Sequence, residues 1–164
     1  VTDSLAMAET LVEENPKVNL YPFDPAARAL ARSITAEMHS GFGALRSACP
    51  MMLAYCYEGF KVHDSVQIDL TRIQDLWTLA RTRHGAGGPW LFGEYSLADV
   101  FYAPVAMRIT TYDLPISDDA REYVNAHLND PALISWRAEG LKDCYDPWPY
   151  PSDLKRKPWP ETKN

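Results

Sequence analysis

The sequence predicts an all-α protein. Apolar residues recur at helical spacing along most of its 164 residues, and no stretch shows the alternation that is typical of a strand. Good N-cap residues precede these apolar stripes, and prolines or glycines separate them. Hydrophobic residues make up 46% and charged residues 23% of the chain, which is the usage of a globular protein with a core.

The first predicted helix occupies residues 1–14. Asp3 and Ser4 precede its apolar stripe, and both are good N-cap residues. A connector over residues 15–24 follows, because Asn15-Pro16 stops the helix and two more prolines punctuate the segment. Three large apolar residues in this connector indicate that it packs against the body of the protein.

A long helix is predicted from Pro25, whose missing N–H costs nothing in a first turn. Its apolar residues continue in helical register as far as Leu45. We therefore expect it to run to a break at Pro50, with Met51–Tyr57 as a bent continuation or a second helical piece.

Four more helices are predicted downstream. The first carries a continuous apolar stripe and ends near His84, ahead of a glycine-rich loop. The second is so apolar in its first turns that it belongs in the core, with Val100 among its inward residues. Residues 145–164 are predicted to form a proline-rich extended tail, with Trp148 and Trp159 as candidate anchors. Three helix starts are predicted at Ser96, Ser117 and Asp130-Pro131.

Composition and charge exclude several classes of function. The net charge of -6 argues against a nucleic-acid partner, which needs a basic face. No apolar run is long enough to span a membrane. Three cysteines without a paired spacing (Cys49, Cys56 and Cys144) favour a reduced, cytoplasmic setting. The four histidines lack metal-ligand spacing, so no metal site is expected.

Ser96-Leu97-Ala98-Asp99 is the sharpest local motif. It predicts a capping box in which the Ser96 hydroxyl accepts from the Asp99 N–H and the Asp99 carboxylate accepts from the Ser96 N–H. Tyr95 and Val100 flank the box as a candidate hydrophobic staple. Taken alone, this motif indicates the start of a helix and no function.

Asp3-Ser4 allows two interpretations. Either residue can be an ordinary N-cap. The same helix start can also bind an amino-acid end, because the N–H groups and the hydroxyl attract a carboxylate while the acid attracts an ammonium group. Local sequence leaves both open.

The order of these features closely resembles the glutathione transferases. The order runs from Asp-Ser-x-Ala through a proline-bearing linker, a long helix and an amphipathic helix. A glycine-rich loop with Trp90-Leu91-Phe92-Gly93 and then Ser-x-Ala-Asp complete it. The segment GPWLFGEYSLADVFYAP carries most of the likeness, and PALISWRA is similar to the last core helix of that family. The resemblance is to a bacterial, cytosolic member.

The resemblance implies a domain organisation. Residues 1–14 correspond to the last helix of a thioredoxin-like domain that is otherwise missing, 15–24 to the linker and 25–144 to the all-helical C-terminal domain. Asp3 and Ser4 match the acid-serine pair that binds the γ-glutamyl end of glutathione. The catalytic Tyr, Ser or Cys would precede Val1, so no residue here is assigned that role. The full protein would transfer glutathione to small electrophiles, a detoxification chemistry.

The resemblance also implies where the electrophile pocket lies. In similar proteins its wall comes from the long helix and its neighbours, and each residue there can equally be a packing or pairing residue. The candidates by position are His39, Arg46, Met51, Tyr55, Arg108 and Tyr112.

The resemblance implies that the enzyme is a homodimer. Two alternatives to the enzyme remain. The same helical domain resembles non-catalytic relatives that act as binding or scaffold modules. A stand-alone helical bundle is the third hypothesis, and it predicts that Leu5, Leu11 and Val12 are exposed.

Overall fold

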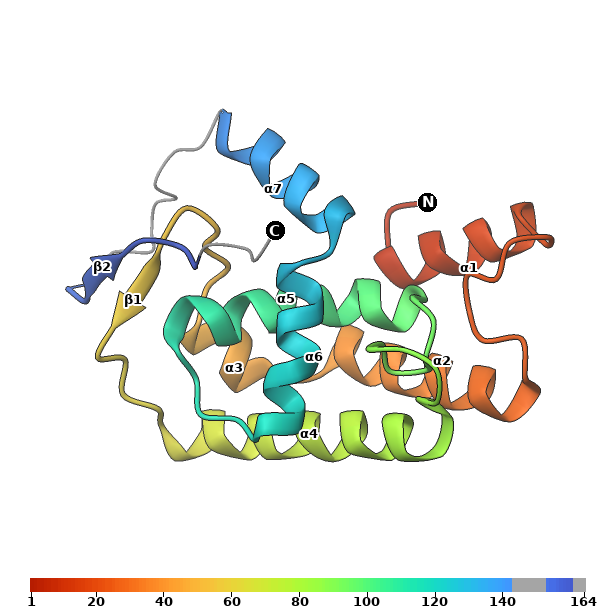
Figure 1. Cartoon of the computed structure of the whole chain (residues 1–164), viewed down its shortest axis with the longest axis horizontal. Helices are drawn as coiled ribbons and strands as arrows, with labels where there is room; N and C mark the ends of the chain where they lie inside the picture. The colour runs from red at the N-terminus through yellow and green to blue at the C-terminus, as the bar shows by residue number, and fades with distance from the viewer. Residues whose placement is uncertain (143–152, 161–164) are drawn as a thin grey trace. The chain divides into compact units, whose positions relative to one another are not determined.

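The computed structural model describes residues 1–142 and 153–160, and in this part of the chain it contains seven helices and one small sheet (Figure 1). The all-α fold class is confirmed, with a two-stranded sheet added to it. Cys144 and the tail residues 145–152 and 161–164, Trp148 among them, lie outside the described residues. The elements are α1 (Ser4–Glu14), α2 (Pro25–Ser40), α3 (Gly43–Ala48), β1 (Cys56–Glu58), α4 (Asp64–His84), α5 (Leu97–Tyr112), α6 (Asp118–Leu128), α7 (Pro131–Lys142) and β2 (Lys155–Lys157).

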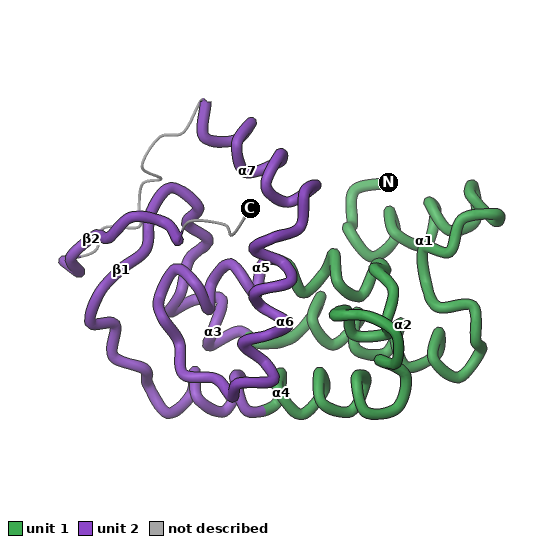
Figure 2. Tube along the Cα trace, in the orientation of Figure 1, with its two compact units in different colours: residues 1–42, 72–103 green, residues 43–71, 104–164 purple. Residues whose placement is uncertain are grey.

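The chain divides into two compact units, coloured separately in Figure 2. The first comprises residues 1–42 and 72–103, and the second comprises residues 43–71 and 104–164. α4 and α5 each contribute a part to both units.

In the first unit, α1 packs on α2. Arg32 of α2 donates to both carboxylate oxygens of Glu9, at 3.3 and 2.8 Å, beside the buried Ala8. The core of this unit forms where Trp77 meets Tyr102 edge to face, with ring centroids 5.6 Å apart. The Tyr102 hydroxyl donates to the Ile34 carbonyl at 3.2 Å, so this buried phenol ties α5 to α2 within the unit.

The long helix ends earlier than its apolar stripe predicts. α2 stops at Ser40, Phe42 takes a left-handed φ of 57°, and α3 begins at Gly43. The predicted run to Pro50 is therefore wrong, because the extended Gly41 and the left-handed Phe42 interrupt the helical backbone, although Phe42 is buried as its place in the apolar stripe suggests. The start of α3 is fixed by Asp69, whose carboxylate accepts from the Leu45 N–H at 2.9 Å.

Residues 51–55 are irregular, and Cys56–Glu58 form β1, so the helical piece predicted over Met51–Tyr57 is also wrong. β1 pairs with β2 in antiparallel register, with Tyr57 opposite Arg156. The basic cluster Lys155–Lys157, which lies in the predicted extended tail, is thus a strand, and Lys155 pairs with Glu58 at 3.0 Å.

Candidate functional site

Asp3 and Ser4 stand at the exposed start of α1. Asp3 is its N-cap, and the Oδ1 atom accepts from the backbone N–H groups of Leu5 at 2.9 Å and Ala6 at 3.1 Å. This geometry follows from local chemistry, since a short acidic side chain ahead of a helix reaches the first free N–H groups. The other carboxylate oxygen, Oδ2, faces a different partner.

That partner is His39, from the last turn of α2. Its Nε2 lies 3.0 Å from Asp3 Oδ2, and its Nδ1 lies 3.2 Å from Ser4 Oγ. The ring also contacts Phe101 of α5 edge-on, with centroids 6.4 Å apart. We call Asp3, Ser4 and His39 the α1-start cluster; it joins residues 35 positions apart in the sequence.

The electrostatics of this cluster favour an ionised carboxylate. The Ala6 N–H and, to a lesser extent, His39 hold the pKa of the Asp3 carboxyl below its ordinary value of 3.8. With 54% of its side chain exposed, this carboxylate can meet a cation from solution. The Ser4 hydroxyl and the His39 ring supply hydrogen-bonding groups for an anion next to it.

The Ser-His-Asp order of these contacts resembles the proton relay of serine hydrolases. Such chemistry also needs N–H donors aimed at a developing oxyanion. At this helix start the N–H groups of Leu5 and Ala6 donate to the Asp3 side chain, and that of Met7 donates to the Asp3 carbonyl. The cluster therefore suits binding of a zwitterionic group better than acyl transfer.

Asp99 lies fully buried at the start of α5. Its Oδ2 accepts from the Ser96 N–H at 2.9 Å, as a capping box requires, and from the Ser96 hydroxyl at 3.1 Å. The Asp99 N–H donates to the Ser96 carbonyl at 3.0 Å, so the hydroxyl acts as a donor to the carboxylate. Oδ1 accepts from the Leu91 N–H at 3.1 Å, which fastens the preceding loop to the helix. This is a structural role.

Two candidate pocket residues, Arg108 and Tyr112, donate to the irregular segment 49–53. Arg108 Nε donates to the Cys49 carbonyl at 2.9 Å, and the Tyr112 hydroxyl donates to the Pro50 carbonyl at 3.0 Å. Met51 Sδ lies 3.7 Å from Arg108 Nη1. The geometry gives Arg108 and Tyr112 a scaffold role, and contact with a ligand stays a prediction for these three residues.

Tyr55 and Arg46 lie elsewhere in the second unit. Tyr55 packs edge-on against Tyr57 at 5.4 Å and under the Arg156 guanidinium at 4.2 Å. Arg46 is exposed on the short α3. Their place in a pocket also remains a prediction.

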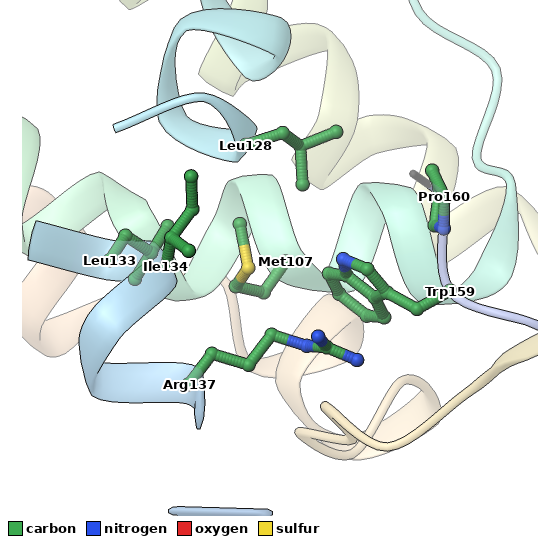
Figure 3. Close-up of a pocket in the computed structure, with 7 residues that line it drawn as sticks. All are labelled: Met107, Leu128, Leu133, Ile134, Arg137, Trp159 and Pro160. Atoms are coloured by element: carbon green, nitrogen blue, oxygen red, sulfur yellow. The ribbon is translucent and has the colours of Figure 1, made fainter. Parts of the chain in front are cut away.

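A cavity of about 280 Å³ lies in the second unit, and none of the six pocket candidates is among the residues that line it (Figure 3). Arg137 of α7 donates through Nε to the Leu53 carbonyl at 2.8 Å and stacks on Trp159 at 4.5 Å. The only sequence signal for this site was Trp159 in the tail. The side chains that surround the space are Met107, Leu128, Leu133, Ile134, Arg137, Trp159 and Pro160.

Over residues 1–142 and 153–160, no group of three His, Cys, Asp or Glu side chains is placed to hold a metal ion. In that part of the chain, no helix is both long and apolar enough to cross a membrane.

Comparison with solved structures finds a clear likeness in fold. A glutathione transferase homolog from Burkholderia GL BGR1, solved with bound glutathione, superposes with a TM-score of 0.63. The two share a fold. The match covers 87% of this chain and 68% of the other, at 20% sequence identity. No protein-family model and no curated protein matches this sequence.

Proposed function

We propose that this chain binds glutathione as the helical part of a glutathione transferase-like protein. The observation that carries the proposal is the α1-start cluster, in which an exposed carboxylate, a hydroxyl and an imidazole meet at a helix N-terminus. The structural neighbour, which shares this fold, was solved with glutathione bound.

The chemistry of the ligand matches the cluster. The γ-glutamyl end of glutathione carries one ammonium and one carboxylate on the same carbon. Asp3 would pair with the ammonium group, while the Ser4 hydroxyl and the positive end of α1 would hold the carboxylate. The contacts of His39 with Asp3 and Ser4 support a role in holding both side chains in position, and its contact with the electrophile stays a prediction.

The transferase reaction needs two further parts. Under this proposal a Tyr, Ser or Cys in a thioredoxin-like segment ahead of Val1 favours the glutathione thiolate, which is the nucleophile. A small electrophile is the second substrate, and apolar cavities with few polar groups are the usual sites for such molecules. A cytoplasmic homodimer is the proposed assembly, and Ile68, 69% exposed on α4, is an apolar side chain that a second copy could cover.

Calorimetric titration of glutathione into the purified chain tests the binding step. Asp3→Asn should weaken binding about tenfold or more, since a hydrogen bond to a charged group contributes about 1.5–3 kcal/mol. Ser4→Ala should weaken it about fivefold, since a neutral hydrogen bond contributes about 1 kcal/mol. Ser33→Ala, an exposed serine of α2, is the matched control and should leave the affinity unchanged.

Equal affinity for all four proteins would show that Asp3 and Ser4 are only a helix cap. The intact mass of the native protein tests the enzyme separately against the 18.5 kDa of this chain. A native mass that is larger by about 8 kDa, the size of a small domain, would indicate an additional domain that can carry the catalytic residue. A native mass equal to this chain, with glutathione binding retained, would favour a non-catalytic binding module.

A further inference from the structure

A second cavity, of about 320 Å³, lies in the first unit. One wall is the end of the connector with the first turn of α2, and the other is the end of α4 with the loop before α5. Neither wall contains a residue of the α1-start cluster. The lining residues are Asn19, Tyr21, Pro22, Phe23, Asp24, Ala27, His84, Ala86, Phe92, Glu94, Tyr95 and Ser96.

Phe23, which lines this cavity, is unusually exposed for an aromatic residue. It is 83% exposed, the highest value among the large apolar side chains exposed in the described chain. Its backbone is nevertheless held, because Arg28 Nη1 donates to the Phe23 carbonyl at 2.8 Å and to the Pro22 carbonyl at 3.3 Å. A fixed backbone that presents an apolar ring to water costs free energy unless something covers the ring.

Guanidinium groups cover other aromatic rings of this chain. Three aromatic faces lie under guanidinium groups of the chain itself: Tyr21 under Arg32, Tyr55 under Arg156 and Trp159 under Arg137. A cation over an aromatic face is stabilised by the negative potential of that face. Phe23 offers the same surface to a cation from solution, and the half-exposed Tyr95, whose ring packs edge to face against Trp90 with centroids 4.6 Å apart, lies beside it in the lining.

The charges of the cavity have the matching sign. Asp24 and Glu94 contribute two carboxylates to its lining, and the lining contains no Lys or Arg. Asp24 uses Oδ1 to cap α2 at the Ala27 N–H, 2.8 Å away, while Glu94 is exposed on the opposite wall. Arg28 is a neighbouring cation, and its guanidinium donates to the carbonyls of the lining residues Pro22 and Phe23. His84 stacks on Phe92 with centroids 6.0 Å apart.

We propose that this cavity binds a small aliphatic diamine or alkylammonium compound, with ammonium groups near Glu94 and Asp24 and methylene groups against Phe23 and Tyr95. Its volume is at the lower end of the range for small-molecule sites, about 300–1,000 Å³, which suits a linear amine of few atoms. This inference is independent of glutathione binding at the α1-start cluster.

The test is an NMR titration of the whole chain with putrescine, a linear diamine, and with the neutral diol of the same chain length. Putrescine should shift the signals of Phe23 and Tyr95 saturably, and the diol should not. Phe23→Ala and Glu94→Gln should each weaken putrescine binding about two- to fivefold, the range expected for one exposed cation–π contact or surface ion pair. The double variant should weaken it about tenfold. Both side chains are exposed, so circular dichroism should show an unchanged fold.

The control is Glu13→Gln, which removes the same charge from an exposed position of α1. It should leave putrescine binding unchanged. The proposal is overturned if putrescine gives no saturable shift, if the diol binds as well, or if Glu13→Gln weakens binding as much as Glu94→Gln. The last outcome would mean that a protein with a net charge of -6 attracts diamines without a specific site.

Discussion

Replacing Asp99 by Ala should destabilise the protein far more than losing a helix cap. A surface cap contributes about 1 kcal/mol. Asp99 is fully buried and accepts from two backbone N–H groups, those of Leu91 and Ser96, in addition to the Ser96 hydroxyl. Each buried donor left without a partner costs about 1–3 kcal/mol. We therefore expect a loss of about 3–5 kcal/mol, a large fraction of the usual 5–15 kcal/mol of a domain.

Urea unfolding followed by far-ultraviolet circular dichroism measures this loss. Asp99→Asn keeps one acceptor oxygen and should retain part of the stability. Asp118→Asn is the matched control, because Asp118 is an exposed acid in the first turn of α6 and should change stability by no more than about 0.5 kcal/mol. A loss of about 1 kcal/mol for Asp99→Ala would refute the reasoning and reduce the residue to a cap.

Three further predictions concern two buried side chains, His127 and Cys49, and the half-buried Arg108. Burial lowers the pKa of His127 from 6.5 to about 3, so the folded protein keeps this ring neutral. Because the unfolded chain takes up the proton, about 2 kcal/mol of stability should be lost between pH 7.5 and 5, and urea unfolding of His127→Leu should lack this loss. Burial raises the pKa of the Cys49 thiol to about 12, so mass spectrometry after iodoacetamide treatment should find it unmodified. Arg108→Ala should cost about 1–3 kcal/mol in urea unfolding, because the Cys49 carbonyl loses its donor.

Helix starts could be predicted from the sequence because their signals are local. Asp24 with Pro25 begins α2, and Ser117 caps α6 through the Ala120 N–H, as their residue types suggest. A cap is a contact between residues three positions apart, so no tertiary knowledge is needed to find it. The order of the helices followed from these starts and from the apolar stripes between them.

The ends and faces of elements depended on distant partners. Residues 49–53 are irregular, and their carbonyls accept hydrogen bonds from side chains of α5 and α7 rather than from a helical backbone. Thr111 Oγ1 donates to the Met52 carbonyl at 2.8 Å, and Arg137 Nε donates to the Leu53 carbonyl at 2.8 Å. Val100 is 43% exposed although it was expected inward, because an almost wholly apolar helix does not reveal which face is buried. The strands are three residues each, too short to show an alternating pattern.

The glycine-rich loop before α5 has a steric explanation. A Cβ atom on Gly88 would lie 1.9 Å from the Gly93 carbonyl oxygen, and Gly93 itself has a φ of 82°. Only residues without a side chain allow the loop to fold back on itself in this way. The glycines therefore shape the loop that contributes Ala86, Phe92 and Glu94 to the lining of the proposed diamine cavity.

Whether the fold itself uses a side chain for packing or hydrogen bonding is a better guide to a binding role than the residue type. The resemblance suggests Arg108 and Tyr112 as pocket candidates, and both donate to backbone carbonyls, so the fold itself has a use for them while their contact with a ligand stays a prediction. Ser4 and Phe23 are both exposed. The core requires neither the hydroxyl of Ser4 nor the aromatic ring of Phe23. A side chain that stability does not need, held on a fixed backbone beside a charge or a cavity, is the stronger candidate for binding. By that criterion the helix start at Asp3-Ser4 and the cavity edge at Phe23 are the two places to test first.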